Sequence, residues 1–296
     1  MDKLTEFLTA HPFILGDGAM GTMLQAAGLT TGGAPEEWNV TRPEVLRGIF
    51  KSYVDAGSQV ITTNSFGGTR FRLGRENLQD RVHEFNLAAA RLACQAADEA
   101  DHEVLVAGDI GPTGEIMEPL GDLTPDSARL AYAEQAAALA EGGVDFLLIE
   151  TMSALEEVEA AIAGIRSACD LPIAATMTFD TRFRTMMGVK PVQAVQALYE
   201  WGIRAMGANC GNGPAEIERV VGEMLAVKPA DVHLIAQSNA GLPKYSPADK
   251  KITYDGTPEV MAAYARKMRE MGVRYIGACC GSTPAHIAAM RAALET

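Results

Sequence analysis

The sequence predicts an α/β fold, namely a single (β/α)8 TIM barrel. Three observations support this fold. Short apolar runs alternate with longer segments of helical period, eight such pairs follow one another in order, and each apolar run turns polar at its end. The 296 residues suit one barrel, and no linker or low-complexity stretch divides them. We therefore predict one domain over residues 1–296.

Eight short runs are the expected strands. Most of them are almost continuously apolar, as parallel strands are when both faces of the sheet are buried. They cover residues 12–18, 58–66, 103–111, 144–151, 171–179, 203–210, 232–239 and 273–280.

The segments that follow these runs are the expected helices, and several stop at a glycine such as Gly57, Gly202 or Gly272, which is a common helix-ending residue. The helices cover residues 43–57, 80–100, 125–143, 154–169, 190–202, 214–228, 257–272 and 283–295. A doubly wound open sheet is the second choice. It should carry a Gly-rich phosphate loop after its first strand, and residues 16–22 are Gly-rich there, but we expect them to lack the glycine spacing of a dinucleotide-binding loop.

The composition excludes several classes of function. A net charge of −13 without a basic patch is unlike a nucleic-acid-binding protein. No apolar run approaches the roughly 18 residues of a membrane span, and the first residues lack the pattern of a secretory signal. Five cysteines, an odd number scattered along the chain, suggest a reducing environment. We expect a cytoplasmic protein that binds neither membranes nor nucleic acid.

Polar residues gather where the expected strands end, and core packing does not require them there. In a barrel the carboxyl ends of all strands meet at one rim, which is where active sites of this fold lie. Two long connections, residues 19–57 and 239–259, also leave that rim. The polar residues are Asp17, Thr62, Thr63, Asn64, Asp109, Glu150, Thr178, Asp180, Asn209, Cys210, Ser238, Asn239, Cys279 and Cys280.

Three of the five cysteines fall at that rim. Cys210 ends the sixth expected strand, and Cys279 and Cys280 end the eighth, so one strand separates them in a closed barrel. Three thiolates match a zinc ion with one open coordination position, and soft sulfur ligands favour zinc over magnesium or calcium. For the adjacent pair alone, the alternatives are one buried and one exposed thiol, or a redox pair. Cys94 and Cys169 lie in a helix and at a helix end, where ordinary small thiols are expected.

If zinc binds here, the two neighbouring thiols of the "GACCGSTP" stretch must both face one metal ion. Gly277 and Gly281 flank the pair, and we expect both to let the backbone leave regular strand geometry. A centre with three thiolates is electron-rich and generates hydroxide poorly, whereas a substrate thiol that joins it loses its proton. The chemistry that follows is alkyl transfer to a thiol.

Seven motifs also resemble those of a known family, and they occur in that family's order. They are "ILGDGAMGTMLQ", "TTNSFGG", "DIGPTGE", "ETMSALEEVEAA", "GANCGNGP", "SNAGLP" and "GACCGSTP". From about residue 12 to about 290 the chain resembles the zinc-dependent homocysteine S-methyltransferase family. It is most similar to the homocysteine-binding module of cobalamin-dependent methionine synthase and less so to the betaine and S-methylmethionine enzymes.

The resemblance implies roles for specific residues. It implies zinc on Cys210, Cys279 and Cys280, and a homocysteine ammonium held by Asp17 and Glu150. Carboxylates suit an ammonium group through charge-assisted hydrogen bonds. The alternatives are a turn or helix cap for the aspartate and a structural ion pair for the glutamate.

Three further residues complete the predicted substrate site. Backbone N–H groups at Gly18 and Ala19, at a loop-to-helix turn, are candidates to receive the homocysteine carboxylate. Asn209, beside the first cysteine, is the third predicted substrate contact.

The methyl donor is not named by the sequence. Our preferred hypothesis is a separate methylcorrinoid protein, because the chain carries no D-x-H-x-x-G cobalamin motif and residues 179–191, with Arg182, Arg184 and two methionines, resemble the methionine synthase segment. A small sulfonium or betaine-type donor is an alternative, for which Phe66, Tyr245 and Tyr254 are candidate cage residues. A further alternative is that the methyl acceptor is a thiol other than homocysteine.

One alternative belongs to another class of function, and an aldolase-type barrel is disfavoured. A non-catalytic zinc or thiol component of a methyl-transfer complex would show no turnover and would have no use for Asp17 and Glu150. An aldolase-type barrel requires a Schiff-base lysine at a strand end, and no expected strand ends in lysine.

Overall fold

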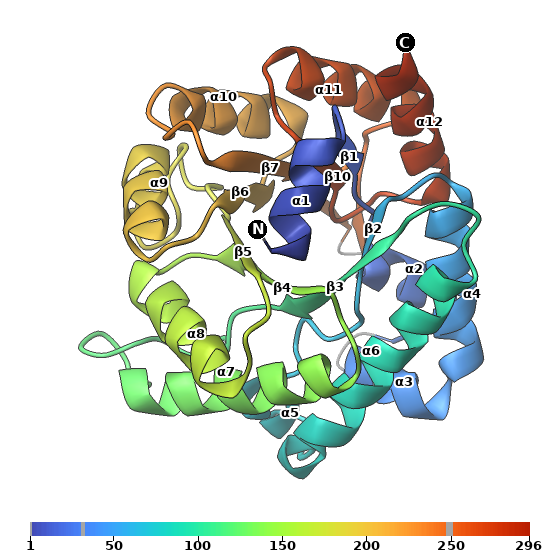
Figure 1. Ribbon diagram of the computed structural model, residues 1–296. Coiled ribbons are helices and arrows are strands. Elements are labelled where there is room, and N and C mark those ends of the chain that lie inside the picture. Colours follow the sequence, from blue (N-terminus) through green and yellow to red (C-terminus); the bar gives the residue numbers. More distant parts are fainter. Residues whose placement is uncertain (1, 31–32, 247–250) are drawn as a thin grey trace.

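The computed structural model describes residues 2–30, 33–246 and 251–296, and it confirms the predicted TIM barrel (Figure 1). Eight parallel strands form one sheet in the order β1-β10-β7-β6-β5-β4-β3-β2. A parallel bridge between Gly16 and Val60 joins the two edge strands, so the sheet closes on itself. The strands are β1 Ile14–Leu15, β2 Val60–Thr62, β3 Leu105–Ile110, β4 Phe146–Met152, β5 Ile173–Met177, β6 Ala205–Cys210, β7 His233–Ser238 and β10 Tyr275–Ala278.

All eight predicted helices surround this sheet. Most begin with proline at the first helical position, where its missing N–H has no helical partner to lose. Gly57, Gly202 and Gly272 have positive φ values of 98°, 80° and 87°, as predicted for residues that end a helix. The helices are α4 Pro43–Asp55, α6 Val82–Asp98, α7 Pro125–Glu141, α8 Leu155–Ala168, α9 Pro191–Glu200, α10 Pro214–Leu225, α11 Pro258–Glu270 and α12 Pro284–Glu295.

Several shorter elements were not predicted. The long connection after β1 holds α2 and α3, and the connection after β7 holds an antiparallel hairpin of β8 and β9. The additional elements are α1 Lys3–Ala10, α2 Met20–Ala26, α3 Trp38–Thr41, α5 Arg70–Gly74, β8 Lys244–Ser246 and β9 Lys251–Thr253, with short 3₁₀ turns at Pro35–Glu37 and Gln79–Arg81.

Helix α1 closes the amino end of the barrel and lies across the ring of strands in Figure 1. Leu4, Phe7 and Leu8 are buried against strand residues of the barrel interior. Burial of each such side chain stabilises the fold by about 1.5–3 kcal/mol. Asp2 caps the helix by accepting a hydrogen bond from the Thr5 amide. The amino end is therefore sealed, and the carboxyl end is left for a site. None of the helices in the described ranges has the length and apolar character to cross a bilayer.

The Gly-rich stretch after β1 has the spacing of a dinucleotide-binding loop at Gly16, Gly18 and Gly21. The open-sheet alternative is nevertheless excluded, because the sheet closes on itself between Gly16 and Val60. A side-chain Cβ on Gly18 would lie 2.6 Å from Ser282 Oγ and 2.9 Å from the Tyr53 ring. At this position glycine is therefore required for close packing.

The prediction for the glycines around the cysteine pair is half right. Gly281 has a φ of 83°, and a Cβ there would overlap the ring of Tyr254. Gly277 is instead a regular residue of β10 paired with Gln237, so it does not release the backbone, and its lack of a side chain leaves room for that glutamine. The turn that presents the thiols comes from residues after the strand.

Candidate metal centre and substrate cavity

The carboxyl ends of the strands surround a cavity of about 590 Å³. It is lined by seven of the eight predicted site residues: Asp17, Gly18, Ala19, Glu150, Cys210, Cys279 and Cys280. Their positions in the chain are far apart, and closure of the barrel brings them together. Asn209 lies behind the cavity wall and is fully buried.

The three rim cysteines converge on one point. Their sulfur atoms all lie within 4.8 Å of one another, and within the described ranges they are the one group of residues with metal-ligand spacing. Tetrahedral sulfur ligands at about 2.3 Å from one zinc ion lie about 3.8 Å apart, which is within the spacing of these three atoms. The residues present therefore fit a metal with three sulfur ligands.

Local backbone geometry explains how adjacent thiols reach the same point. The Cys279 amide donates to the Ser238 carbonyl at 2.7 Å, and the Cys280 carbonyl accepts from the Ala240 amide at 2.9 Å. The pair is thereby fixed to the end of β7. Cys210 has a φ of 65°, which is uncommon for a residue with a side chain. This turn at the end of β6 directs it to the other two.

The thiols share hydrogen bonds that favour one negative charge. Hydrogen bonds from Cys210 and Cys279 hold the pKa of Cys280 far below its usual range. The pKa of Cys279 is raised well above its usual range, since its hydrogen bonds to Cys210 and Cys280 stabilise its protonated form. Of the three thiols, Cys280 is thus the one whose hydrogen bonds most favour the thiolate, which is the form that binds soft metals.

Asp17 forms one anionic wall of the cavity. It is 2% exposed, and its carboxylate accepts hydrogen bonds from the Thr62 amide at 2.7 Å and the Thr62 hydroxyl at 3.1 Å. Burial raises its pKa to about 7, and the Thr62 hydrogen bonds oppose that rise. It caps no helix, because the cap of α2 is Ala19.

Glu150 approaches the cavity from β4 and is half-buried. Burial, followed by the charges of Asp17 and Cys280, raises its pKa to about 8. No ion pair involves it in the described part of the chain, so the alternative of a structural ion pair finds no support. Asp17 and Glu150 thus line the same cavity, and neither forms an ion pair among the described residues.

Asn209 supports the wall that carries Glu150. Its Oδ1 accepts hydrogen bonds from the Thr151 amide at 2.9 Å and the Thr176 hydroxyl at 2.8 Å. Its Nδ2 donates to the Thr151 hydroxyl at 2.6 Å and lies 3.5 Å from Glu150 Oε2. The predicted contact of Asn209 with substrate stays a prediction, whereas its described contacts are with the residues beside the cavity.

The two backbone groups predicted for a carboxylate differ. The Ala19 amide already donates to Ser282 Oγ at 3.0 Å, which leaves it engaged within the protein. The Gly18 amide has no backbone or side-chain acceptor among the described hydrogen bonds, so it is the better candidate of the two. Both roles stay predictions.

Other cavity residues were not assigned a role from the sequence. Asp109 of β3 and Gln237 of β7 are almost fully buried, and each has a side-chain oxygen without a hydrogen-bond partner in the described residues. Their position at strand ends was the available signal. Arg72 of α5 is a third such residue. Tyr254, a candidate cage residue from the sequence, follows the hairpin, lines the cavity and approaches Cys280.

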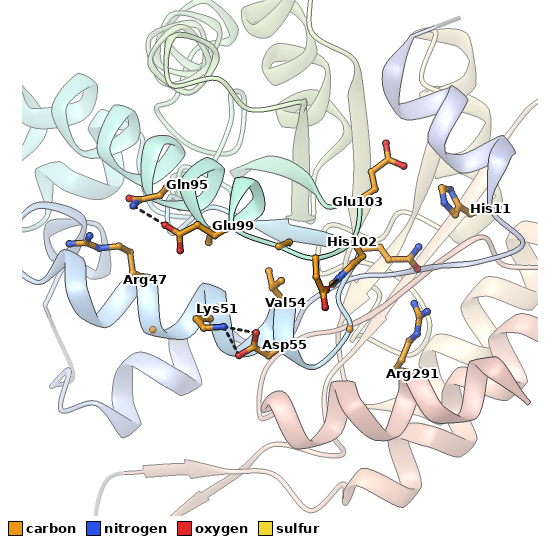
Figure 2. A pocket seen from close by; sticks show the side chains of 16 residues that line it. His11, Arg47, Lys51, Val54, Asp55, Gln95, Glu99, His102, Glu103 and Arg291 are labelled. Carbon is orange, nitrogen blue, oxygen red and sulfur yellow. Dashed lines mark hydrogen bonds and ion pairs between the residues drawn. The ribbon is translucent and has the colours of Figure 1, made fainter.

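A second cavity, of about 990 Å³, lies at the other end of the molecule (Figure 2). Its lining includes His11, Gly57 and His102, which precede β1, β2 and β3. Figure 2 shows charged side chains around it, among them the ion pair of Lys51 and Asp55. It is therefore an amino-end cleft that contains none of the predicted site residues.

Two comparisons by sequence relate the chain to known proteins. The family model of homocysteine S-methyltransferase matches residues 14–294. The methionine synthases of Mycobacterium tuberculosis and Mycobacterium leprae are both 34% identical to this chain. The aligned regions cover 95% and 96% of it, respectively. In both cases the matched region is 24% of the relative, so the chain spans about a quarter of their length.

Solved structures show the same fold. The metallated form of the homocysteine methyltransferase MmuM from Escherichia coli has a TM-score of 0.81 at 23% identity, covering 98% of this chain and 99% of that one. The oxidized form has a TM-score of 0.82 at 22% identity, covering 99% of both chains. With a family model that matches nearly the whole barrel, the chain belongs to the homocysteine S-methyltransferase family.

Proposed function

We propose that this protein transfers a methyl group to the thiol of homocysteine and forms methionine, with zinc held by Cys210, Cys279 and Cys280. The observation that carries the proposal is the convergence of three thiols with the carboxyl groups of Asp17 and Glu150 on one cavity at the carboxyl end of the barrel. The zinc, when bound, supplies Lewis acidity that favours the thiolate form of the substrate. The whole barrel, residues 1–296, acts as one domain in this proposal.

Asp17 and Glu150 hold the substrate ammonium group. Each charge-assisted hydrogen bond contributes roughly 1.5–3 kcal/mol, and an ammonium group offers three donors. Thr62 fixes the first carboxylate and Asn209 fixes the backbone beside the second. The Gly18 amide is the proposed donor to the substrate carboxylate. The substrate is thereby oriented with its thiol toward the cysteines.

The reaction is a displacement at the methyl carbon. The substrate sulfur forms a bond to that carbon while the bond between the methyl group and its donor breaks, and the electron pair leaves with the donor. Proximity and orientation supply much of the rate enhancement in such a step. The donor must therefore approach from the open side of the cavity, opposite the cysteines.

We favour a separate methylcorrinoid protein as donor. The two mycobacterial relatives described above are named methionine synthase, and this chain matches only about a quarter of their length. Loops at the rim also expose apolar side chains, among them Met186 at 73% and Leu120 at 74%. These are suited to contact with a protein. The five free cysteines support our proposal of a cytoplasmic location.

A small onium donor is the second candidate. Phe66 and Tyr254 line the cavity, and aromatic faces attract methylated cations. The cavity volume of about 590 Å³ is sufficient for two small molecules.

The test is methionine formation from homocysteine with a panel of donors: a methylcorrinoid protein, free methylcobalamin, S-methylmethionine and glycine betaine. Turnover with the corrinoids supports the preferred donor, and turnover with only the onium compounds selects the second. Methionine from none of them contradicts the proposed function. The turnover of a Met186→Asp protein should fall about tenfold with the corrinoid protein and stay unchanged with free methylcobalamin. Leu130→Asp, which alters an exposed apolar residue on α7, is the control and should change neither rate.

A further inference from the structure

Arg72 is a cationic side chain in the cavity whose role is not accounted for by homocysteine binding. It lies on α5, it is half-buried, and its guanidinium carbon is 5.9 Å from the centre of the Phe66 ring. A guanidinium group has five N–H donors, and in the described residues the Arg72 guanidinium makes no hydrogen bond or ion pair. Its donors are therefore available to a ligand.

The other arginines near this helix are engaged. Arg70 forms a bidentate pair with Glu134, at 2.8 and 2.9 Å. Arg75 donates to the Gly114 carbonyl at 2.6 Å and to Glu115 at 3.1 Å. Arg75 also lines the cavity, but its guanidinium is held by these two contacts. Among the described residues, Arg72 is therefore the arginine of this cavity whose guanidinium has no hydrogen-bond or ion-pair partner.

Gly114 leaves room for this group. Its φ is 77°, and a Cβ there would lie 3.1 Å from Arg72 Nη1 and 2.6 Å from Arg75 Nη2. A side chain at this position would therefore displace the guanidinium groups. The "DIGPTGE" motif supplies this glycine, so the loop after β3 and helix α5 together form a cationic corner of the cavity.

Neutralisation of a protein carboxylate does not explain Arg72. Glu36 is one candidate, because the Arg72 charge lowers the pKa of this buried carboxyl, although burial raises it overall. The two side chains nevertheless form no ion pair within 4.0 Å among the described pairs, and Glu36 Oε1 instead accepts from the Gly67 amide at 2.7 Å. Arg72 thus acts on Glu36 only through space.

The homocysteine carboxylate is also a poor partner for Arg72. That carboxylate is joined to the same carbon as the ammonium group, so it must lie close to Asp17 and Glu150. The Gly18 amide is already proposed as the donor to it, and among the described residues no hydrogen bond or ion pair joins Arg72 to Asp17 or Glu150. The cationic corner is therefore left for another ligand.

We propose that Arg72 forms an anion subsite for the methyl donor, in which its guanidinium binds a carboxylate or phosphate group that the donor carries. A planar guanidinium suits bidentate recognition of both groups, and a Lys replacement retains the charge but loses this geometry. The carboxylate would come from a small onium donor, and the phosphate from the nucleotide tail of a corrinoid. This inference rests on the proposed methyl transfer.

The experiment compares Arg72→Met and Arg72→Lys with Arg70→Met, a matched control on the same helix. KM is measured for glycine betaine and for trimethylsulfonium, which has no carboxylate, and for methylcobalamin and methylcobinamide, which has no nucleotide phosphate. Calorimetry gives the affinity of homocysteine. A lost charge-assisted interaction of about 1.5–3 kcal/mol corresponds to about a ten- to hundredfold rise in KM.

The expected result is a rise in KM of that size for one anionic donor in Arg72→Met, a smaller rise in Arg72→Lys and none in Arg70→Met. The donor without the anion and the affinity for homocysteine should be unchanged. A rise for glycine betaine alone identifies the carboxylate, and a rise for methylcobalamin alone identifies the phosphate. Equal KM values for all donors, or a matching loss of homocysteine affinity, would overturn the proposal. Absence of all methionine formation would instead contradict the proposed function, in which case calorimetry of glycine betaine binding still tests the subsite.

Discussion

Thr151 and Asn209 exchange two hydrogen bonds across the wall of the substrate cavity. The Thr151 amide donates to Asn209 Oδ1 at 2.9 Å, and Asn209 Nδ2 donates to the Thr151 hydroxyl at 2.6 Å. Thr151 has a φ of 59°, a left-handed conformation that is rare for a β-branched residue and costs of order 1–3 kcal/mol. The asparagine holds this conformation, and Glu150 is the residue immediately before it.

Replacement of Asn209 by alanine should therefore affect both stability and binding. Loss of the amide leaves buried groups of Thr151 and Thr176 without their partner, at a cost of about 1–3 kcal/mol in the free energy of unfolding. Urea denaturation measures this loss, and calorimetry should show weaker binding of homocysteine. Gln196→Ala, which removes an exposed amide on α9, is the control and should change neither quantity. Homocysteine affinity equal to that of the unaltered protein would show that Asn209 does not position Glu150.

Cys279→Ser should bind much less zinc than the unaltered protein. A serine hydroxyl is a poor replacement for a thiolate, and the remaining sulfur ligands are two. Metal analysis after dialysis against a weak chelator measures the zinc content. Cys94→Ser is the matched control, because Cys94 is a half-buried thiol of α6 outside the cluster, and it should keep one zinc per chain. Retention of full zinc by the Cys279 variant would remove this residue from the ligand set.

Asp17→Asn should weaken homocysteine binding by about ten- to a hundredfold, since it removes one charged partner of the ammonium group. Its zinc content should stay intact. Calorimetry with 4-mercaptobutanoate, which has the thiol and carboxylate but no amine, provides the comparison. The variant and the unaltered protein should bind this compound equally. An equal loss of affinity for both thiols would mean that Asp17 supports the cavity and does not recognise the ammonium group.

The pKa of Asp17 also predicts how stability depends on pH in the protein without ligand. Burial raises this pKa from 3.8 to about 7, so between these values the folded protein holds a proton that the unfolded chain has released. The unfolded state then binds fewer protons, and the free energy of unfolding falls as pH rises through this window. Above about pH 7 the contribution no longer changes.

Asp17→Asn should remove this part of the pH dependence, because an amide does not titrate in the window. Urea denaturation of both proteins at pH 5, 6, 7 and 8 measures it. The asparagine variant should gain stability relative to the unaltered protein as pH rises. Asp126→Asn, at an exposed position in the first turn of α7, is the control. A constant difference between the two proteins at all four pH values would contradict the raised pKa.

The sequence by itself determined the order of the strands and helices and the rim at which the site forms. Apolar runs and helical periods are local properties, so each major element is visible in its own segment. Convergence of Cys210 with Cys279 and Cys280 also followed from the sequence, because eight consecutive βα pairs place the sixth and eighth strand ends near each other.

Tertiary structure decided how individual residues act within that frame. The left-handed conformation of Cys210 and Thr151, the position of Gly277 inside β10 and the position of the Arg72 guanidinium over the Phe66 ring depend on contacts between distant segments. The bond between Thr151 and Asn209, for example, joins residues that are 58 positions apart. Local propensity disfavours a positive φ at a threonine, and only packing and hydrogen bonds of the folded barrel compensate for that cost. The sequence therefore located the site, and the fold determined which of its groups are engaged within the protein and which remain available to a ligand.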